Sequence, residues 1–356
     1  MYSRRSTTVK YVLAAFFGAI VYCEWFIYLL QQSHWTEFDC SSDQDPSCVK
    51  ILFIADPQIQ GDEAVSPPWS YIINWDSDRY LKSTFNVVAD YFKPDILVFL
   101  GDLMDEGSIS TIPQFHGYVK RLSKIFDWDH HAVQVWLPGD NDIGGENEPI
   151  RHDKIQEFEK VFQQPSVITY FNVSIYKVNA ITYSFPSKTD EPKGTESNFK
   201  MAVSHYPVTL RVTFTQNIMD TINPQIFFCA HDHESKYIKQ YKDFTHKVTT
   251  WFNTPKSTLS ITFDDDSLYE IYVPTCSYRM GTSKIGYGAA ILENYNKNMR
   301  YTVFWSSTRF PYLCLYLGIL IALLLYGLVF YVARLCHRFS KHSVKSADMS
   351  PLLVKM

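Results

Sequence analysis

The stretch "DILVFLGD", Asp95 to Asp102, decides the fold, because it is a short apolar run that ends in a carboxylate. Runs of this length, rich in branched and aromatic residues and bounded by Gly or Pro, are typical of buried β-strands. Four other stretches have the same construction: "VKILFIAD" (Val49 to Asp56), "AVQVWLPGD" (Ala132 to Asp140), "KMAVSHYP" (Lys200 to Pro207) and "QIFFCAHDH" (Gln225 to His233). We therefore expect five buried strands between Val49 and His233.

Helix-like stretches lie between these runs. In "DSDRYLKSTFNVVADYF" (76–92) the apolar residues have helical spacing, and we expect Asp76 to be the N-cap. "ISTIPQFHGYVKRLSKIF" (109–126) and "RHDKIQEFEKVF" (151–162) are two further examples. Strands that alternate with helices predict an α/β domain. After His233 the pattern changes to successive strand-like runs, so we expect a sheet-rich second half packed on the first.

The five strand-like runs share a second property, because each ends in residues that can bind a metal ion. These residues are Asp56 with Gln58, Asp102, Asp140, His205, and His231 with His233. A single strand-terminal Asp is usually a turn former, and "HDH" alone could be a surface turn. The shared position carries the argument, since ligands gather at the carboxyl ends of strands in α/β sheets. Carboxylates, imidazoles and an amide converging there predict a pair of divalent metal sites.

The order of these residues resembles the calcineurin-like metallophosphoesterase superfamily. Its pattern is Asp-x-His, Gly-Asp, Gly-Asn-His-Asp/Glu, a lone His and Gly-His-x-His, and here it reads "DPQ", "GD", "GDND", "SHYP" and "AHDH". "GDLMDEG", "DIGG…FEKVF" and "VPTCSYR" are similar to the subgroup that removes ethanolamine phosphate from a mannose of the glycosylphosphatidylinositol (GPI) anchor. The resemblance covers about Lys50 to Tyr301. It implies two mixed β-sheets packed face to face with flanking helices.

The resemblance also implies a ligand set and a cofactor. Asp56, Gln58 and His233 would hold the first metal ion, and Asp102 would bridge the two ions. Asp140, His205 and His231 would hold the second ion. The superfamily uses divalent metals, with Mn²⁺ the usual ion in this subgroup and Zn²⁺ or Fe as alternatives.

The third motif, "GDND", departs from the superfamily pattern. Asp140 replaces a neutral Asn ligand and adds a negative charge, which should weaken the attraction of a doubly charged phosphate monoester more than that of a diester. Asn141 replaces a His, and an amide cannot transfer a proton at neutral pH. We expect His152 to supply the missing proton, with His130 and His131 as alternatives. The other interpretation is that all three are surface histidines, as most such residues are.

Two long apolar stretches flank the predicted domain. Residues 11–31 and 312–333 are each long enough to cross a bilayer as a helix, and we expect a retained signal anchor at the first because no small-residue cleavage site follows it. The alternative is a cleaved signal peptide. The positively charged flanks at 1–10 and 334–356 favour a cytosolic location for both ends. Residues 32–48 then form a lumenal linker, and residues 49–305 form the lumenal domain.

Two local features agree with a lumenal domain. "NVS" makes Asn172 a glycosylation acceptor, and Cys40 and Cys48 bracket a short polar loop that a disulfide could close in an oxidising compartment. The net charge of −4 and the absence of a Lys/Arg run give no reason to expect nucleic acid as a partner.

We therefore expect a membrane-anchored lumenal phosphodiesterase that acts on the GPI glycan in the early secretory pathway, between the endoplasmic reticulum and the cis-Golgi. Its expected partners are GPI-anchored proteins, the bilayer and cargo-sorting receptors. One alternative is a weak or inactive relative that binds GPI-linked cargo. Another is a hydrolase of a different lipid-linked phosphodiester or diphosphate.

Overall fold

The computed structural model describes residues 2–41, 47–128, 130–242, 244, 246–252, 254–264, 266–293 and 295–347, with the backbone alone for residues 2–9 and 337–347. Part of the predicted linker (42–46) and of the predicted cytosolic tail (348–356) lies outside the described residues. The chain divides into two units, Met1–Thr308 and Arg309–Met356.

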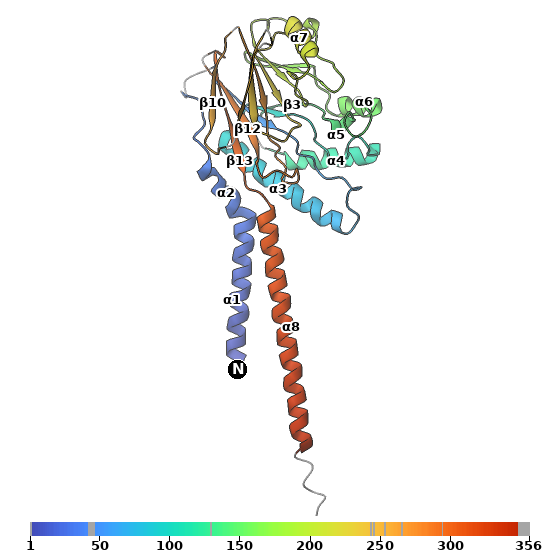
Figure 1. Ribbon diagram of the computed structural model, residues 1–356, viewed down its shortest axis with the longest axis vertical. Coiled ribbons are helices and arrows are strands. Elements are labelled where there is room, and N and C mark those ends of the chain that lie inside the picture. Colours follow the sequence, from blue (N-terminus) through green and yellow to red (C-terminus); the bar gives the residue numbers. More distant parts are fainter. Residues whose placement is uncertain are drawn as a thin grey trace, which may run out of the picture. The chain divides into compact units, whose positions relative to one another are not determined.

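Two mixed β-sheets packed face to face form the domain, as predicted, with helices around them (Figure 1). The first sheet has the order β10-β13-β12-β1-β2-β3, with β1 Val49–Ile54, β2 Ile96–Phe99, β3 Val133–Trp136, β10 Thr258–Thr262, β12 Ile285–Glu293 and β13 Asn298–Ser306. The second has the order β4-β5-β6-β7-β11-β8-β9, with β4 Val167–Tyr170, β5 Val173–Lys177, β6 Phe199–Val203, β7 Ile226–Cys229, β8 Lys236–Tyr241, β9 Lys247–Trp251 and β11 Ser267–Tyr272.

The five predicted strands are β1, β2, β3, β6 and β7. Strands β1, β2 and β3 pair in parallel, as do β6 and β7, so their carboxyl ends share one edge of each sheet. Both faces of β1 are buried, and Phe53 stacks on Phe228 of the other sheet with 4.1 Å between ring centroids. Strands buried on both faces read as continuous apolar runs, which is why the sequence pattern identified them.

The part of the chain after His233 is rich in strands, as predicted, but it does not pack on the first half as a layer of its own. Strands β10, β12 and β13 extend the first sheet, whereas β8, β9 and β11 extend the second. The physical reason is that β1 and β7 each leave an unpaired edge, and backbone groups at an edge need partners. Strand β12 pairs antiparallel with β1, and β11 pairs parallel with β7.

The helices of the domain are α3 Trp69–Phe92, α4 Ile112–Ile125, α5 Asp140–Ile143, α6 His152–Val161 and α7 Val212–Thr221, with a short 3₁₀ turn η3 at Lys188–Asp190. The predicted N-cap at Asp76 is wrong, because α3 begins seven residues earlier and Asp76 is buried within it, accepting a hydrogen bond from Tyr278 at 3.0 Å. Two prolines precede Trp69, and proline is well tolerated at the start of a helix.

Among the residues that the structure describes, two helices are long and apolar enough to cross a membrane, at Lys10–His34 and Phe310–Cys336. The first lies within a continuous helical run made of α1 Tyr2–Val21, a π-helical turn η1 at Tyr22–Phe26, α2 Ile27–Gln31 and a 3₁₀ turn η2 at Gln32–His34. The second lies within α8, Phe310–Ala347.

Candidate metal centre

Five of the predicted ligands lie in sharp turns that follow strands. Asp56, Gln58, Asp102, His231 and His233 all have positive φ angles, between 40° and 67°. This left-handed region is sparsely populated by residues other than Gly, and such backbone strain clusters at functional sites. These turns follow β1, β2 and β7, and they bring side chains from both sheets together.

Asp102 lies at the centre of the cluster. Its Oδ1 accepts a hydrogen bond from the backbone N–H of Asn141 at 2.9 Å, and its Oδ2 accepts from the side-chain amides of Asn141 and Gln58 at 2.8 and 2.9 Å. A Cβ atom placed on Gly139 would lie 2.1 Å from Asp102 Oδ1. The glycine of the third motif is therefore required by the close approach of the Asp102 carboxylate.

His205 joins the two halves of the cluster. Its Nδ1 donates a hydrogen bond to the backbone carbonyl of Leu100 at 2.8 Å, which leaves the Nε2 lone pair directed toward the carboxylates. His205 Nε2 lies 3.0 Å from Asp140 Oδ1 and 3.4 Å from Asp102 Oδ1. Nδ1 of His231 lies 3.3 Å from the same Asp140 oxygen.

The residues present fit divalent metal ions. Asp56 is fully buried, yet neither of its carboxylate oxygens has a hydrogen-bond partner among the described residues. A buried charge without partners is costly, and coordination of a cation is one way to compensate it. Two groups of residues could each hold an ion, because within each group the ligand atoms lie within 4.8 Å of one another. The groups are Asp56, Asp102 and His205, and Asp140, His205 and His231. His233 Nε2 lies 3.8 Å from Asp56 Oδ1 and 3.4 Å from Gln58 Nε2, so all seven predicted ligands belong to one cluster.

The cluster shifts the pKa values of its members. Burial raises the pKa of Asp56 to about 8, and the Asp102 carboxylate adds to the shift. Burial disfavours protonation of His205, but the carboxylates of Asp102, Asp140 and Asp56 outweigh it and raise the pKa of His205 to about 10. A proton and a metal ion therefore compete for His205.

Asp142 has a role that the sequence did not indicate. Its Oδ2 accepts hydrogen bonds from the backbone N–H groups of Gly139 and Leu103 at 2.8 and 3.1 Å, and its Oδ1 accepts from Met104 at 3.0 Å. These bonds tie the third motif to the loop that carries Asp102. Arg279 is a second such residue, since it donates to the backbone carbonyl of Gln58 and to Asp105, both at 2.9 Å.

The predicted catalytic residues fall in different places. Asn141 lies in the cluster, and its side-chain amide is bound to Asp102. His152 is exposed at the first residue of α6, and no contact among the described residues joins it to the predicted ligands. His130 and His131 are also exposed, with the ring of His130 packed against Trp128.

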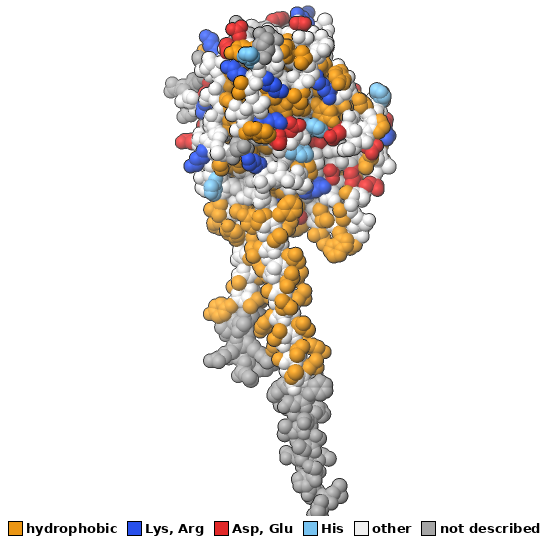
Figure 2. All heavy atoms as spheres, viewed as in Figure 1, with side chains coloured by type: hydrophobic (Ala, Val, Ile, Leu, Met, Phe, Trp, Pro, Cys, Tyr) orange, Lys and Arg blue, Asp and Glu red, His pale blue; other side chains and the backbone are white. Residues whose placement is uncertain are grey.

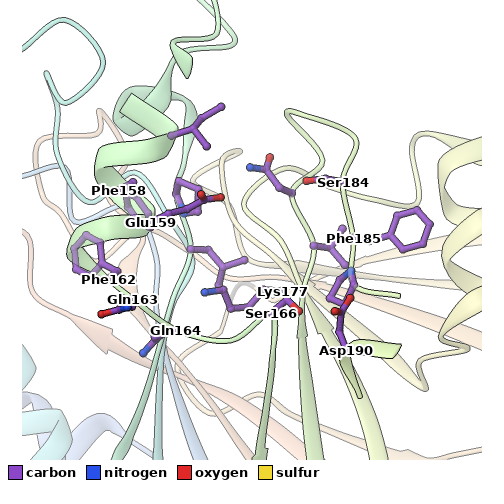
Figure 3. A pocket seen from close by; sticks show the side chains of 16 residues that line it. Phe158, Glu159, Phe162, Gln163, Gln164, Ser166, Lys177, Ser184, Phe185 and Asp190 are labelled. Atoms are coloured by element: carbon purple, nitrogen blue, oxygen red, sulfur yellow. The ribbon is translucent and has the colours of Figure 1, made fainter. Parts of the chain in front are cut away.

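A cavity of about 420 Å³ lies beside the third motif but does not include the predicted ligands. Figure 3 shows Phe158, Glu159 and Phe162 on one side and Ser184 and Phe185 on the other, with Lys177 between them. Leu137 and Pro138, which precede Gly139, also line this cavity. Burial lowers the pKa of Lys177.

The two features expected of a lumenal domain lie on the same unit as the cluster. Asn172 is half-buried in the turn between β4 and β5, where its backbone carbonyl accepts a hydrogen bond from Phe199 at 2.8 Å. Cys40 and Cys48 are joined by a disulfide, with their Cα atoms 6.2 Å apart. Cys229 and Cys276 are buried free thiols.

A family model described as calcineurin-like phosphoesterase matches residues 49–235. The curated relatives include the Metallophosphoesterase 1 of Cricetulus griseus, 28% identical over 170 residues, which are 46% of this chain and 42% of that protein. The Metallophosphoesterase 1 of Ailuropoda melanoleuca is 28% identical over 183 residues, which are 50% of this chain and 45% of that protein. The matched part thus spans less than half the length of these relatives. The matches confirm the predicted superfamily and support the predicted subgroup.

Among solved structures, GAP50, the anchor in the inner membrane complex of Plasmodium, aligns with a TM-score of 0.38 and 12% identity. This alignment covers 72% of this chain and 85% of that one.

Proposed function

Because the chain belongs to the calcineurin-like phosphoesterase family, we propose that it is a membrane-anchored, metal-dependent phosphodiesterase that removes ethanolamine phosphate from a mannose of GPI anchors. The proposal places the domain in the lumen of the early secretory pathway and both chain ends in the cytosol. GPI-anchored proteins, and the receptors that sort them, are the proposed partners.

The observation that carries the proposal is the buried ligand cluster at the strand ends. Neither buried carboxylate oxygen of Asp56 has a hydrogen-bond partner among the described residues, and Asp102 and His205 lie beside it. We propose that the cluster holds two divalent ions, with Mn²⁺ as the first choice. Such ions would supply positive charge to the reacting phosphate and would lower the pKa of a bound water molecule.

The residues around the cluster support a diester as substrate. Asp140 makes a third carboxylate beside Asp56 and Asp102, so the charge of two divalent ions is more fully balanced than with a neutral ligand at this position. A singly charged diester loses less attraction than a doubly charged monoester. Asn141 holds Asp102 in place and cannot transfer a proton. A sugar leaving group then needs a proton from another source, and general acid catalysis is worth about 10²–10⁴-fold.

A second candidate function follows from Asn141. A protein without a proton donor at this position is a weaker catalyst, and the cluster would then bind a GPI glycan or its phosphate without hydrolysing it. The two candidates share the ligand residues but differ in whether product is formed.

The test uses the full chain purified in detergent and loaded with Mn²⁺. We expect close to two ions per chain and release of ethanolamine phosphate from a GPI glycan. Asp102→Asn should lose both metal and activity. Asp153→Asn should retain them, because Asp153 is an exposed carboxylate on α6.

Deletion of the gene should leave ethanolamine phosphate on surface GPI anchors. An unchanged glycan would exclude the phosphodiesterase. A metal-loaded wild-type chain that binds the glycan but releases no ethanolamine phosphate would favour the binding protein.

A further inference from the structure

The first two turns of α3 expose large apolar side chains. Trp69, Tyr71, Ile72 and Trp75, here called the α3 patch, are 66%, 70%, 58% and 62% exposed. Figure 2 shows hydrophobic side chains gathered over the start of this helix. No charged residue occurs between Ala64 and Trp75. Tyr71, Ile72 and Trp75 share one helix face, and Trp69 lies one turn before Ile72.

The rest of α3 has the usual polarity of a surface helix. From Asp76 onward it buries residues such as Phe85 and exposes Lys82 and Asp90. A helix that packs on a core exposes polar residues on its outer face. In the first two turns of α3 the exposed side chains are apolar instead. Contiguous exposed apolar surface marks an interaction site.

The α3 patch is continuous with the end of the first apolar helix. Arg79 forms an ion pair with Glu24, and its guanidinium lies over the ring of Trp75 at 5.1 Å from the centroid. One residue further, Tyr80 meets Tyr28 edge to face at 6.1 Å. The apolar helix, the ion pair and the patch therefore form one connected surface.

Helix geometry sets an upper limit on the height of this contact above the inner boundary of the bilayer. Glu24 is the fourteenth residue after Lys10, which is a rise of about 21 Å at 1.5 Å per residue. The hydrocarbon core of a bilayer is about 30 Å thick. When Lys10 lies at the inner boundary, Glu24 and its partner Arg79 lie no higher than the outer boundary. Trp69, ten residues before Arg79, lies within about 15 Å of it along the helix.

We propose that the α3 patch is inserted in the outer interface of the same bilayer that the Lys10–His34 helix crosses. Trp and Tyr are the residues enriched at membrane interfaces, and Ile72 adds an apolar anchor between them. The patch is thus a membrane contact that the folded domain makes beside the first apolar helix, and it does not depend on catalytic activity.

Helix α4 connects α3 to the loop that carries the first metal-binding motif. Arg121 on α4 pairs with Asp78 on α3 at 2.8 Å and donates to the backbone carbonyl of Gln60 at 2.6 Å. Gln60 is two residues from Gln58 in the first motif. An inserted α3 therefore holds the loop after β1 at a set height above the membrane.

The test places a fluorescent NBD label on the patch of the full chain in nanodiscs. The label is attached through Ile72→Cys in a chain whose exposed cysteines are replaced, Cys314→Ser and Cys336→Ser. The matched control is Val248→Cys on β9, because Val248 is 60% exposed and Ile72 is 58% exposed. Emission is compared in nanodiscs with and without brominated lipids.

We expect brominated lipids to quench the label at position 72 at least threefold more than the label at position 248. Equal, weak quenching at both positions would overturn the proposal. A label at position 72 that is shifted to the blue but not quenched by lipid would also overturn it, because a protein would then cover the patch. Unchanged thermal unfolding of both labelled chains checks that the fold is retained.

Discussion

At the scale of single residues, Asp140 sets the charge of the metal centre. Its Oδ1 lies within 3.3 Å of both His205 Nε2 and His231 Nδ1, and nearby Asp56 and Asp102 are also carboxylates. An Asn at this position would keep a ligand oxygen and remove one negative charge.

The first prediction concerns this charge. In Asp140→Asn, kcat/KM for an aryl phosphate monoester should rise relative to that for the matching diester by about tenfold, since one charge at close range is worth at least about 1.4 kcal/mol. Hydrolysis of the two substrates by the Mn²⁺-loaded chain measures the ratio. An unchanged ratio would show that Asp140 does not select substrate charge.

The second prediction concerns Asn141. Asn141→Ala removes the 2.8 Å bond to Asp102 Oδ2, so metal affinity should fall about 10- to 100-fold, as it does when partners of metal ligands are lost. Metal titration of the variant checks this, with Asn198→Ala as a control because that amide binds Ser174 instead. A lower kcat with unchanged metal affinity would mean that Asn141 contacts the substrate and does not position Asp102.

At the scale of elements, the turn from β3 into α5 decides whether the centre forms. Gly139 lies between the strand and Asp140, and its amide donates to Asp142 at 2.8 Å. The space beside its Cα is filled by Asp102. The turn therefore holds the second and third motifs in contact through one glycine.

The third prediction tests this contact with two alanine variants. Gly139→Ala should displace Asp102 and abolish metal binding, because the new Cβ would lie 2.1 Å from Asp102 Oδ1. Gly117→Ala in α4 meets nothing within 4 Å, and it should stabilise the helix by up to about 1 kcal/mol. Metal content and thermal unfolding separate the two outcomes. Full metal occupancy in Gly139→Ala would refute the proposed role of the glycine.

At the scale of the whole molecule, the proposed function requires the metal centre and Asn172 to be lumenal. Both belong to the two-sheet domain that follows the Lys10–His34 helix, so they must lie on one side of the membrane. Charge at the flanks of the two apolar helices supports cytosolic ends.

The fourth prediction concerns this topology. Microsomes carrying the chain with a C-terminal tag should lose the tag to added protease, while the domain with its Cys40–Cys48 disulfide stays intact. Endoglycosidase should increase the mobility of the wild-type chain but not of Asn172→Gln. Protection of the tag together with digestion of the domain would reverse the proposed orientation.

The sequence by itself determined the five buried strands, the two apolar helices and the superfamily. Strands such as β1 are buried on both faces, so their composition alone identifies them, and their terminal Asp and His residues identify the ligand types. These are local properties of the sequence, so they can be recognised without knowledge of the rest of the fold.

Only the tertiary structure decided which residues act together. The late strands enter both sheets because β1 and β7 had edges to pair, and Asp142 joins two motifs through backbone amides that lie more than 30 residues apart. His152 has a side chain that can transfer a proton, but it is exposed. The α3 patch has no sequence motif and is identified only by the exposure of its apolar side chains. Contacts of this kind depend on distance in space, and distance in space is set by the packing of the two sheets.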